Sequence, residues 1–229
     1  MDFIYGMKKA YKEGYDWIWV MDDDTIVTKN ALKELINAKN ILLKKRIKFG
    51  FLNSIVYWKD NNLCLFNLPT AKNDINTYQF LSHGMIKINR ATFVSFLISK
   101  KIIKIVGLPL KEFFIWADDT EYTLRISLNY DLPGYYISKS KVYHLTKLNS
   151  FYSYEFINRE NYKKYCYDIR NRVYIIKNIP QIKYKLDYLK VTLINLLRIL
   201  FSKKIIYFPA LIFSLIWGIF FNPKIEKVD

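Results

Sequence analysis

The 229-residue chain is short of cysteine, glycine and proline, and each shortage excludes a class of protein. Cys64 and Cys166 are its only cysteines and match no zinc-ligand spacing, which argues against a disulfide scaffold or a zinc ribbon. We expect both thiols to be reduced, as in a cytosolic protein. Seven glycines and six prolines exclude a collagenous or low-complexity chain. The first residues lack a basic-then-apolar-then-small pattern, so we expect no signal peptide.

Apolar and basic residues are abundant instead. Hydrophobic residues make up 52% of the chain, enough for one buried core. The net charge is +16, and it is unevenly spread: residues 1–149 hold 22 basic and 14 acidic residues, whereas residues 150–204 hold 12 and 4. This basic density indicates an anionic partner, which is a nucleic acid, an anionic lipid surface or a phosphate-bearing substrate.

An uncharged run of seventeen residues, Ile205–Phe221, follows the basic stretch. A membrane span usually needs about 20 apolar residues, and Pro209 and Gly218 weaken a straight helix. We therefore expect a helix in the headgroup region, making the protein peripheral on the cytoplasmic face of the cell membrane, with at most one C-terminal membrane segment. A buried core helix remains an alternative. Aromatic and basic residues alternate in Tyr162–Tyr174, but no nucleic-acid-binding signature is present, so nucleic acid is not an expected partner.

The order of hydrophobic patterns predicts an α/β domain over residues 1–150 and a helical extension over residues 151–229. Apolar runs rich in aromatic and β-branched residues predict strands, and helical spacing with capping residues predicts helices. The expected helices lie near residues 3–11, 28–38, 92–98, 118–128, 155–180 and 185–201. The expected strands lie near residues 17–21, 49–57, 63–66, 84–88, 135–138 and 141–146.

Three aspartates, Asp22, Asp23 and Asp24, follow the apolar run Trp17–Met21. Adjacent carboxylates repel one another unless a cation or solvent relieves them. In open α/β sheets ligands bind beyond the carboxyl ends of strands, and alternate residues point the same way. Asp22 and Asp24 can therefore converge on one Mg²⁺ or Mn²⁺ ion. The alternative is a solvated acidic turn that caps the next helix; the position after a buried strand favours the metal.

A second acidic cluster, Asp118-Asp119-Thr120-Glu121, follows Trp116. One of its carboxylates can act as a general base toward a hydroxyl group, although a capped helix with an acidic first turn is the common alternative. His144 is a candidate ligand because imidazole binds Mn²⁺ well, although a lone histidine is more often structural. His83 is a weaker candidate, expected in a loop near a donor or acceptor sugar.

Together these segments resemble the family-2-like glycosyltransferases with a GT-A (Rossmann-like) fold, in particular the bacterial rhamnosyltransferase and galactofuranosyltransferase group. The match follows the family's order over about residues 14–174. Its segments are Gly14–Thr25, Gly107-Leu108-Pro109, Phe113–Tyr122, His144 and Arg170-Asn171.

The resemblance implies an inverting, metal-dependent transfer from a nucleotide-sugar donor of the UDP-galactofuranose or dTDP-rhamnose type. The acceptor would be a growing surface glycan or a lipid-linked sugar, and the cofactor Mn²⁺ or Mg²⁺. The implied roles are metal binding by Asp22, Asp24 and His144, donor binding by Asp23 and His83, acceptor binding by Trp116, Asp118 and Glu121, and base catalysis by Asp119. Because Ala117 separates Trp116 from the two aspartates, Asp118 and Asp119 can exchange the last two of these roles.

One departure from the family concerns the start of the chain. Only 21 residues precede Asp22, so we expect a partial GT-A domain without the family's nucleotide-binding half. An inactive remnant or partner subunit of such an enzyme is therefore an alternative, and an exposed sheet edge would favour a homo-oligomer. A basic membrane-binding module, in which the aspartates are only caps, is another. A different phosphoryl enzyme is disfavoured because the chain has no glycine-rich phosphate loop.

Overall fold

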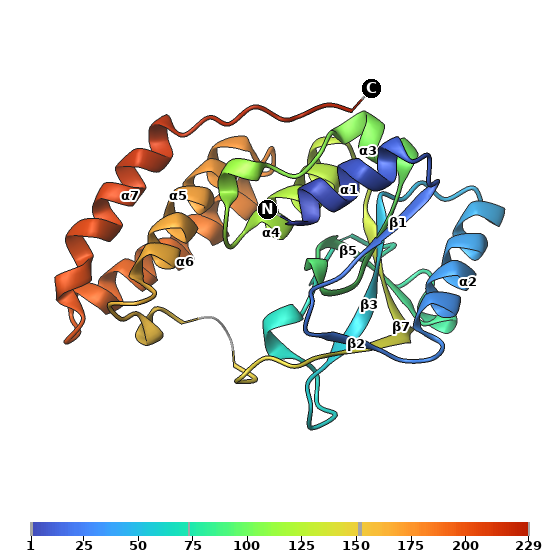
Figure 1. The fold of residues 1–229 in the computed structure, drawn as a ribbon, viewed down its shortest axis with the longest axis horizontal. Helices are drawn as coiled ribbons and strands as arrows, with labels where there is room; N and C mark the ends of the chain where they lie inside the picture. The colour runs from blue at the N-terminus through green and yellow to red at the C-terminus, as the bar shows by residue number, and fades with distance from the viewer. Residues whose placement is uncertain (1, 73, 151–152, 229) are drawn as a thin grey trace. The chain divides into compact units, whose positions relative to one another are not determined.

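The computed structural model describes residues 2–72, 74–150 and 153–228, and the chain divides into two compact units (Figure 1). The first unit comprises Met1–Leu108, Tyr122–Phe151 and Glu226–Asp229. The second comprises Pro109–Glu121 and Tyr152–Ile225. The sequence-based boundary after residue 150 lies close to one of the transitions between units. Two segments lie on the wrong side of that boundary. Pro109–Glu121 precedes it but belongs to the second unit, and Glu226–Asp229 follows it but belongs to the first.

The first unit is built on a seven-stranded mixed sheet, so the protein is α/β, as the sequence predicts. The strand order is β1-β6-β3-β7-β5-β4, with β2 paired to β7 beyond this path. The β3–β7 pair is parallel and the other pairs are antiparallel. The strands are β1 (Trp17–Val20), β2 (Thr25–Val27), β3 (Phe51–Tyr57), β4 (Thr70–Ala71), β5 (Met85–Arg90), β6 (Phe96–Ser99) and β7 (Gly134–His144).

Both faces of the sheet are covered, because successive strand residues point to opposite faces. Phe51 of β3 packs into a core with helices α1 (Asp2–Lys12) and α3 (Lys100–Val106). Its neighbour Leu52 packs into a second core with helix α2 (Ala31–Lys44). Figure 1 shows α1 and α2 on opposite sides of the strands.

The predicted helix at residues 92–98 is wrong. A 3₁₀ turn, η3 (Phe93–Ser95), occupies its first part and strand β6 its second. All four β6 residues are buried between β1 and β3, where backbone groups need partners in neighbouring strands. The helix begins only at Lys100, after Ser99, whose hydroxyl accepts from the Ile102 amide at 3.3 Å.

The two strands expected at 135–138 and 141–146 are one strand, β7. The interruption that the sequence indicates corresponds to a shift in register against β3 between Ser54 and Ile55. The expected strand at 63–66 contains instead an isolated bridge between Tyr57 and Leu63 and the 3₁₀ turn η1 (Leu65–Asn67). The other 3₁₀ turns are η2 (Leu81–His83), η4 (Lys111–Phe113), η6 (Tyr154–Phe156) and η7 (Ile205–Tyr207).

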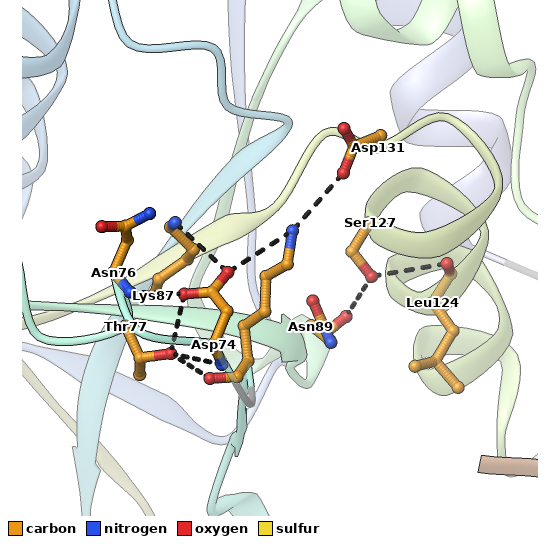
Figure 2. Close-up of polar contacts among 9 residues, drawn as sticks. Asp74, Asn76, Thr77, Lys87, Asn89, Leu124, Ser127 and Asp131 are labelled. Carbon is orange, nitrogen blue, oxygen red and sulfur yellow. Dashed lines mark hydrogen bonds and ion pairs between the residues drawn. The ribbon is translucent and has the colours of Figure 1, made fainter. Parts of the chain in front are cut away.

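A polar network centred on Asp74 joins the loop before β5 to the strand itself (Figure 2). Burial alone would raise the pKa of Asp74, but its contacts outweigh that effect and lower the pKa. The carboxylate lies 3.5 Å from the Lys87 ammonium and 3.7 Å from that of Lys72. It also accepts from the Asn76 amide at 2.9 Å and the Thr77 hydroxyl at 3.3 Å.

Helix α4 (Asp118–Leu124) continues into a π-helical turn, η5 (Arg125–Asn129). Figure 2 shows Ser127 of this turn beside β5, where its hydroxyl donates to the Asn89 carbonyl at 2.7 Å. The buried Arg125 guanidinium donates to the carbonyls of Val106 (2.8 Å) and Leu108 (3.0 Å). These bonds hold the loop that follows α3 against η5.

The second unit is helical. It contains α5 (Tyr162–Asn178), α6 (Ile182–Leu200) and α7 (Phe208–Phe220), which confirms the two helices predicted at 155–180 and 185–201. Gly218 allows α7 to approach α5 closely, because a Cβ there would lie 2.6 Å from the Val173 Cβ. The Lys177 ammonium donates to the last carbonyls of α7, those of Gly218 (3.3 Å) and Ile219 (2.6 Å).

The apolar run Ile205–Phe221 forms η7 and then the 13-residue helix α7. At 1.5 Å per residue α7 is about 20 Å long, against about 30 Å for the apolar part of a bilayer. Among the described residues, no helix combines the length and the apolar character that crossing a membrane requires.

Candidate metal centre and acidic loop

The pairing of β2 with β7 brings the three aspartates to His144. Thr25, the first residue of β2, lies opposite His144, the last residue of β7. The Leu145 amide donates to the Asp24 carbonyl at 3.2 Å, and the Thr25 amide donates to the Asp22 carbonyl at 3.2 Å. The turn between β1 and β2 is thereby fixed against the end of β7.

Asp22, Asp24 and His144 form a compact triad. One potential ligand atom from each residue lies within 4.8 Å of the other two. His144 Nε2 is 3.0 Å from Asp24 Oδ1 and 3.7 Å from Asp22 Oδ2. His144 is buried, Asp22 is half-buried and Asp24 is exposed, so the triad opens to solvent on the side of Asp24.

Two buried residues orient the imidazole of His144. The Asn67 amide nitrogen donates to the Thr92 hydroxyl at 3.1 Å, which turns the Asn67 amide oxygen toward His144. This oxygen lies 2.8 Å from His144 Nδ1 and accepts the proton on that nitrogen. Nε2, the nitrogen facing the carboxylates, is therefore left with a lone pair or with a second proton.

The donor set of two carboxylates and one imidazole could hold a metal ion. Metal-bound histidines usually donate their other ring N–H to a fixed acceptor, the position that Asn67 occupies. Protonation of Nε2 is the alternative, and it would make the triad an ion pair without a metal.

The two residues expected to bind the donor are not in this triad. Asp23 is exposed between the two ligand candidates. His83 precedes β5, whose residue Met85 pairs with Ile137 of β7. A cavity of about 380 Å³ is lined there by Glu34, Asn37, Ala38, Asn40, Ile41, His83, Ile137 and Lys139.

The whole acidic cluster, Asp118 to Glu121, belongs to the second unit, and a strained loop leads into it. Phe114, Trp116 and Ala117 all have positive φ angles, of 60°, 63° and 65°. This conformation is unfavourable for residues with a side chain and persists only where surrounding contacts impose it. Strain of this kind is concentrated at functional sites, so the loop marks the acidic cluster as a candidate functional site.

Arg170 and Asn171 supply the contacts that impose this conformation. The buried Asn171 amide donates to the carbonyls of Phe113 (3.0 Å) and Trp116 (2.9 Å). The Arg170 guanidinium donates to the Glu112 carbonyl at 2.5 Å and lies 4.0 Å from the ring centroid of Phe221. Burial lowers the pKa of Arg170 to about 10. Residues of α5 therefore hold the loop before α4 in place.

The members of the acidic cluster differ in exposure. Asp118 and Asp119 are half-buried and Glu121 is buried. Burial raises the pKa of Asp118 by disfavouring its charged form. Asp119 accepts from the backbone amide of the next residue, Thr120, at 2.5 Å. The half-buried Trp116 ring packs edge-on against Tyr165, with centroids 5.2 Å apart.

Sequence reasoning missed Asn67 and Thr92. Each is a polar residue in an irregular segment, and neither has a local pattern that would single it out. Their contacts depend on how η1 and η3 pack beside β7, which no short-range signal specifies. Asn171 was included only through the family resemblance.

No model of a known protein family matches the chain, and no curated protein matches its sequence.

Proposed function

We propose that this protein is a metal-dependent inverting glycosyltransferase with a GT-A-like (Rossmann-like) fold. The triad of Asp22, Asp24 and His144 supports this proposal best, because it places two carboxylates and an oriented imidazole together where strand β1 ends. Ligands of α/β sheets bind beyond the carboxyl ends of such strands. The strained, clamped loop before Asp118 is a second cluster with the residue types that acceptor binding needs.

In this proposal the residues divide the work between donor and acceptor. Asp22, Asp24 and His144 would hold Mn²⁺ or Mg²⁺, which offsets the negative charge of a departing nucleoside diphosphate. Asp119 would take the proton from the attacking hydroxyl group of the acceptor. Asp118 is the alternative base, since its raised pKa makes its carboxylate more basic than usual. Trp116 and Glu121 would position the acceptor sugar.

The substrates of the proposed reaction are a nucleotide sugar and a hydroxyl acceptor. The donor would be of the UDP-galactofuranose or dTDP-rhamnose type, and Asp23 and His83 are the candidates for contacting it. The acceptor would be a growing surface glycan or a lipid-linked sugar. A single displacement at the sugar carbon, assisted by the base, inverts the configuration there.

A second candidate function follows from the position of β1. Within the described part of the chain, β1 pairs only with β6 and is therefore a sheet edge, although the aspartates follow it directly. Edge strands present unpaired backbone groups to which another strand can bind. The chain would then be a non-transferring remnant or a partner subunit, with the donor pocket completed by another polypeptide.

The metal site is tested by Mn²⁺ titration of the full chain in a calorimeter. We expect one binding site, and an affinity loss of at least about 10-fold when Asp22→Asn and Asp24→Asn are combined. Asp23→Asn is the matched control, because it removes an adjacent carboxylate outside the triad. Unchanged Mn²⁺ affinity in the double variant would leave the triad as an ion pair and remove the basis of the proposal.

Transfer itself is tested with both donor types and a short acceptor glycan. We expect Mn²⁺-dependent release of the nucleoside diphosphate that falls at least about 100-fold in Asp119→Asn, since a general base contributes about that much or more. Mn²⁺ binding should persist in this variant. A chain that binds Mn²⁺ but transfers neither sugar supports the partner-subunit alternative instead.

A further inference from the structure

Helix α6 has a continuous exposed apolar stripe. Its residues recur every three or four positions, which places them on one side of the helix. All six are exposed: Ile182, Leu186, Leu189, Leu193 and Leu197, followed by Phe201 just beyond the helix end. Large solvent-exposed apolar surfaces of this kind mark interaction sites.

The stripe is not the face that α6 uses for packing within its own unit. That face is formed by Thr192, Asn195, Leu196 and Ile199, which are all buried. Leu196 and Ile199 belong to the core of the second unit, together with residues of α5 and α7. The helix therefore has two apolar sides, and within the described residues only one of them packs against other residues.

Helix α7 repeats this arrangement. Leu211, Ser214 and Gly218 face inward, whereas large apolar side chains on the other side are exposed. The exposed residues are Phe213, Ile216, Trp217, Ile219 and Phe220. Tryptophan and phenylalanine are typical of helices that lie at a membrane surface with their apolar face among the lipid headgroups.

The charges around these helices are mostly positive. Between residues 181 and 204, Asp187 is the single acidic residue. The basic residues there are Lys183, Lys185, Lys190, Arg198, Lys203 and Lys204. Lysine and arginine beside an apolar helix face bind the anionic headgroups of a bilayer, and their aliphatic stems add apolar contact.

We propose that the exposed faces of α6 and α7 form a lipid-docking surface, defined by the exposed residues just named, which binds an anionic bilayer with both helices lying in its interface. The combination of apolar stripes with neighbouring positive charge favours this occupant. A second copy of the chain would bring the same cationic residues of two molecules together, which is electrostatically unfavourable. The proposal does not depend on glycosyl transfer.

Vesicle flotation of the full chain tests this surface. We expect binding to vesicles of phosphatidylcholine mixed with phosphatidylglycerol, weak binding to phosphatidylcholine alone, and weakening at high salt because screening reduces the attraction. The combination Leu193→Ser with Leu197→Ser should reduce binding by at least about 10-fold, since two leucine contacts with lipid are lost.

A matched control is available on α2 of the first unit. Leu32 and Leu43 are 45% and 54% exposed, close to the 48% and 52% of Leu193 and Leu197. The combination Leu32→Ser with Leu43→Ser should bind vesicles as the unaltered chain does. Circular dichroism verifies that both double variants are folded.

Three results would overturn the proposal. One is no binding of the unaltered chain to anionic vesicles at low salt, and another is undiminished binding of the Leu193 and Leu197 double variant. The third is a dimer, detected by sedimentation, that this variant abolishes while vesicle binding stays unchanged. The combined Asp22→Asn and Asp24→Asn variant should still bind vesicles, so failure of the metal-site proposal and failure of this one are distinguishable.

Discussion

The amide of Asn67 determines which nitrogen of His144 faces the two aspartates. Asn67 contacts His144 but is not itself in the triad, so its replacement tests orientation separately from ligation. We expect Asn67→Ala to weaken Mn²⁺ binding by about 10- to 100-fold, the usual effect of losing such a supporting hydrogen bond. Calorimetric titration measures this change.

Asn62→Ala serves as the control for that substitution. Asn62 lies in an exposed turn, where it contacts Asp60. Equal Mn²⁺ affinities for Asn67→Ala and Asn62→Ala would show that His144 does not need Asn67 to bind a cation, or that the triad binds none.

The contacts of Asp74 predict a pH-dependent contribution to stability. Because its pKa is lowered on folding, Asp74 stabilises the fold above its ordinary pKa of about 3.9 and loses this contribution as the pH falls through the lower folded value. We expect Asp74→Asn to reduce the free energy of unfolding by about 0.5 to 1 kcal/mol at neutral pH. Urea unfolding at neutral and at strongly acidic pH measures the difference, which should vanish in acid.

Asp131 provides the comparison for Asp74. Its carboxylate lies 3.4 Å from the Lys72 ammonium but is almost fully exposed. Asp131→Asn should therefore leave stability nearly unchanged at both pH values. A difference between Asp74→Asn and the unaltered chain that persists in acid would contradict the electrostatic explanation.

At the scale of residues, the sequence indicated the members of the triad but not the residues that orient His144. Asp22 and Asp24 follow an apolar run that predicts a strand, and His144 was a candidate because an imidazole can complete an acidic metal site. The structure brings these three together. Asn67 and Thr92 could not be foreseen, because a buried polar residue is recognised by its partners and these come from distant segments.

At the scale of elements, local patterns predicted those that are long or clearly bounded. The strand β1 and the helices α5 and α6 lie where the sequence placed them. The segment 92–98 was misassigned because its apolar residues suit a buried helix or a buried strand equally well. Pairing of β6 with both β1 and β3 decided the outcome, and such pairing is invisible to a local pattern.

The close approach of α5 and α7 depends on Gly218. We expect Gly218→Ala to destabilise the second unit by about 1 to 3 kcal/mol, because the new methyl group would overlap Val173. Thermal unfolding followed by circular dichroism measures the change.

Gly6→Ala is the matched control, since Gly6 lies in helix α1 with no atom within 4 Å of an added Cβ. That substitution should stabilise the chain by about 0.5 to 1 kcal/mol through helix propensity. Destabilisation of similar size in both variants would show that the α5–α7 contact is not the cause.

At the scale of the whole molecule, the two units are interleaved in sequence. The prediction of two consecutive parts, 1–150 and 151–229, could not anticipate this. Pro109–Glu121 belongs to the second unit because Asn171 and Arg170 of α5 bind its backbone carbonyls. These contacts join residues more than fifty positions apart, and the local sequence around either partner does not reveal them.

The last residues of the chain return to the first unit, although the helices before them belong to the second. The Leu108 amide donates to the Glu226 carbonyl at 2.9 Å, and Val228 packs into the core that contains α1 and α3. Val228 is 7% exposed, so we expect Val228→Ser to cost about 1 to 3 kcal/mol. Hydrogen exchange measured by mass spectrometry should then accelerate in α1 and α3 but not in α6. Ile75→Ser, at a residue that is 96% exposed, should change neither, and equal acceleration in α6 and in the first unit would show that the two units unfold together.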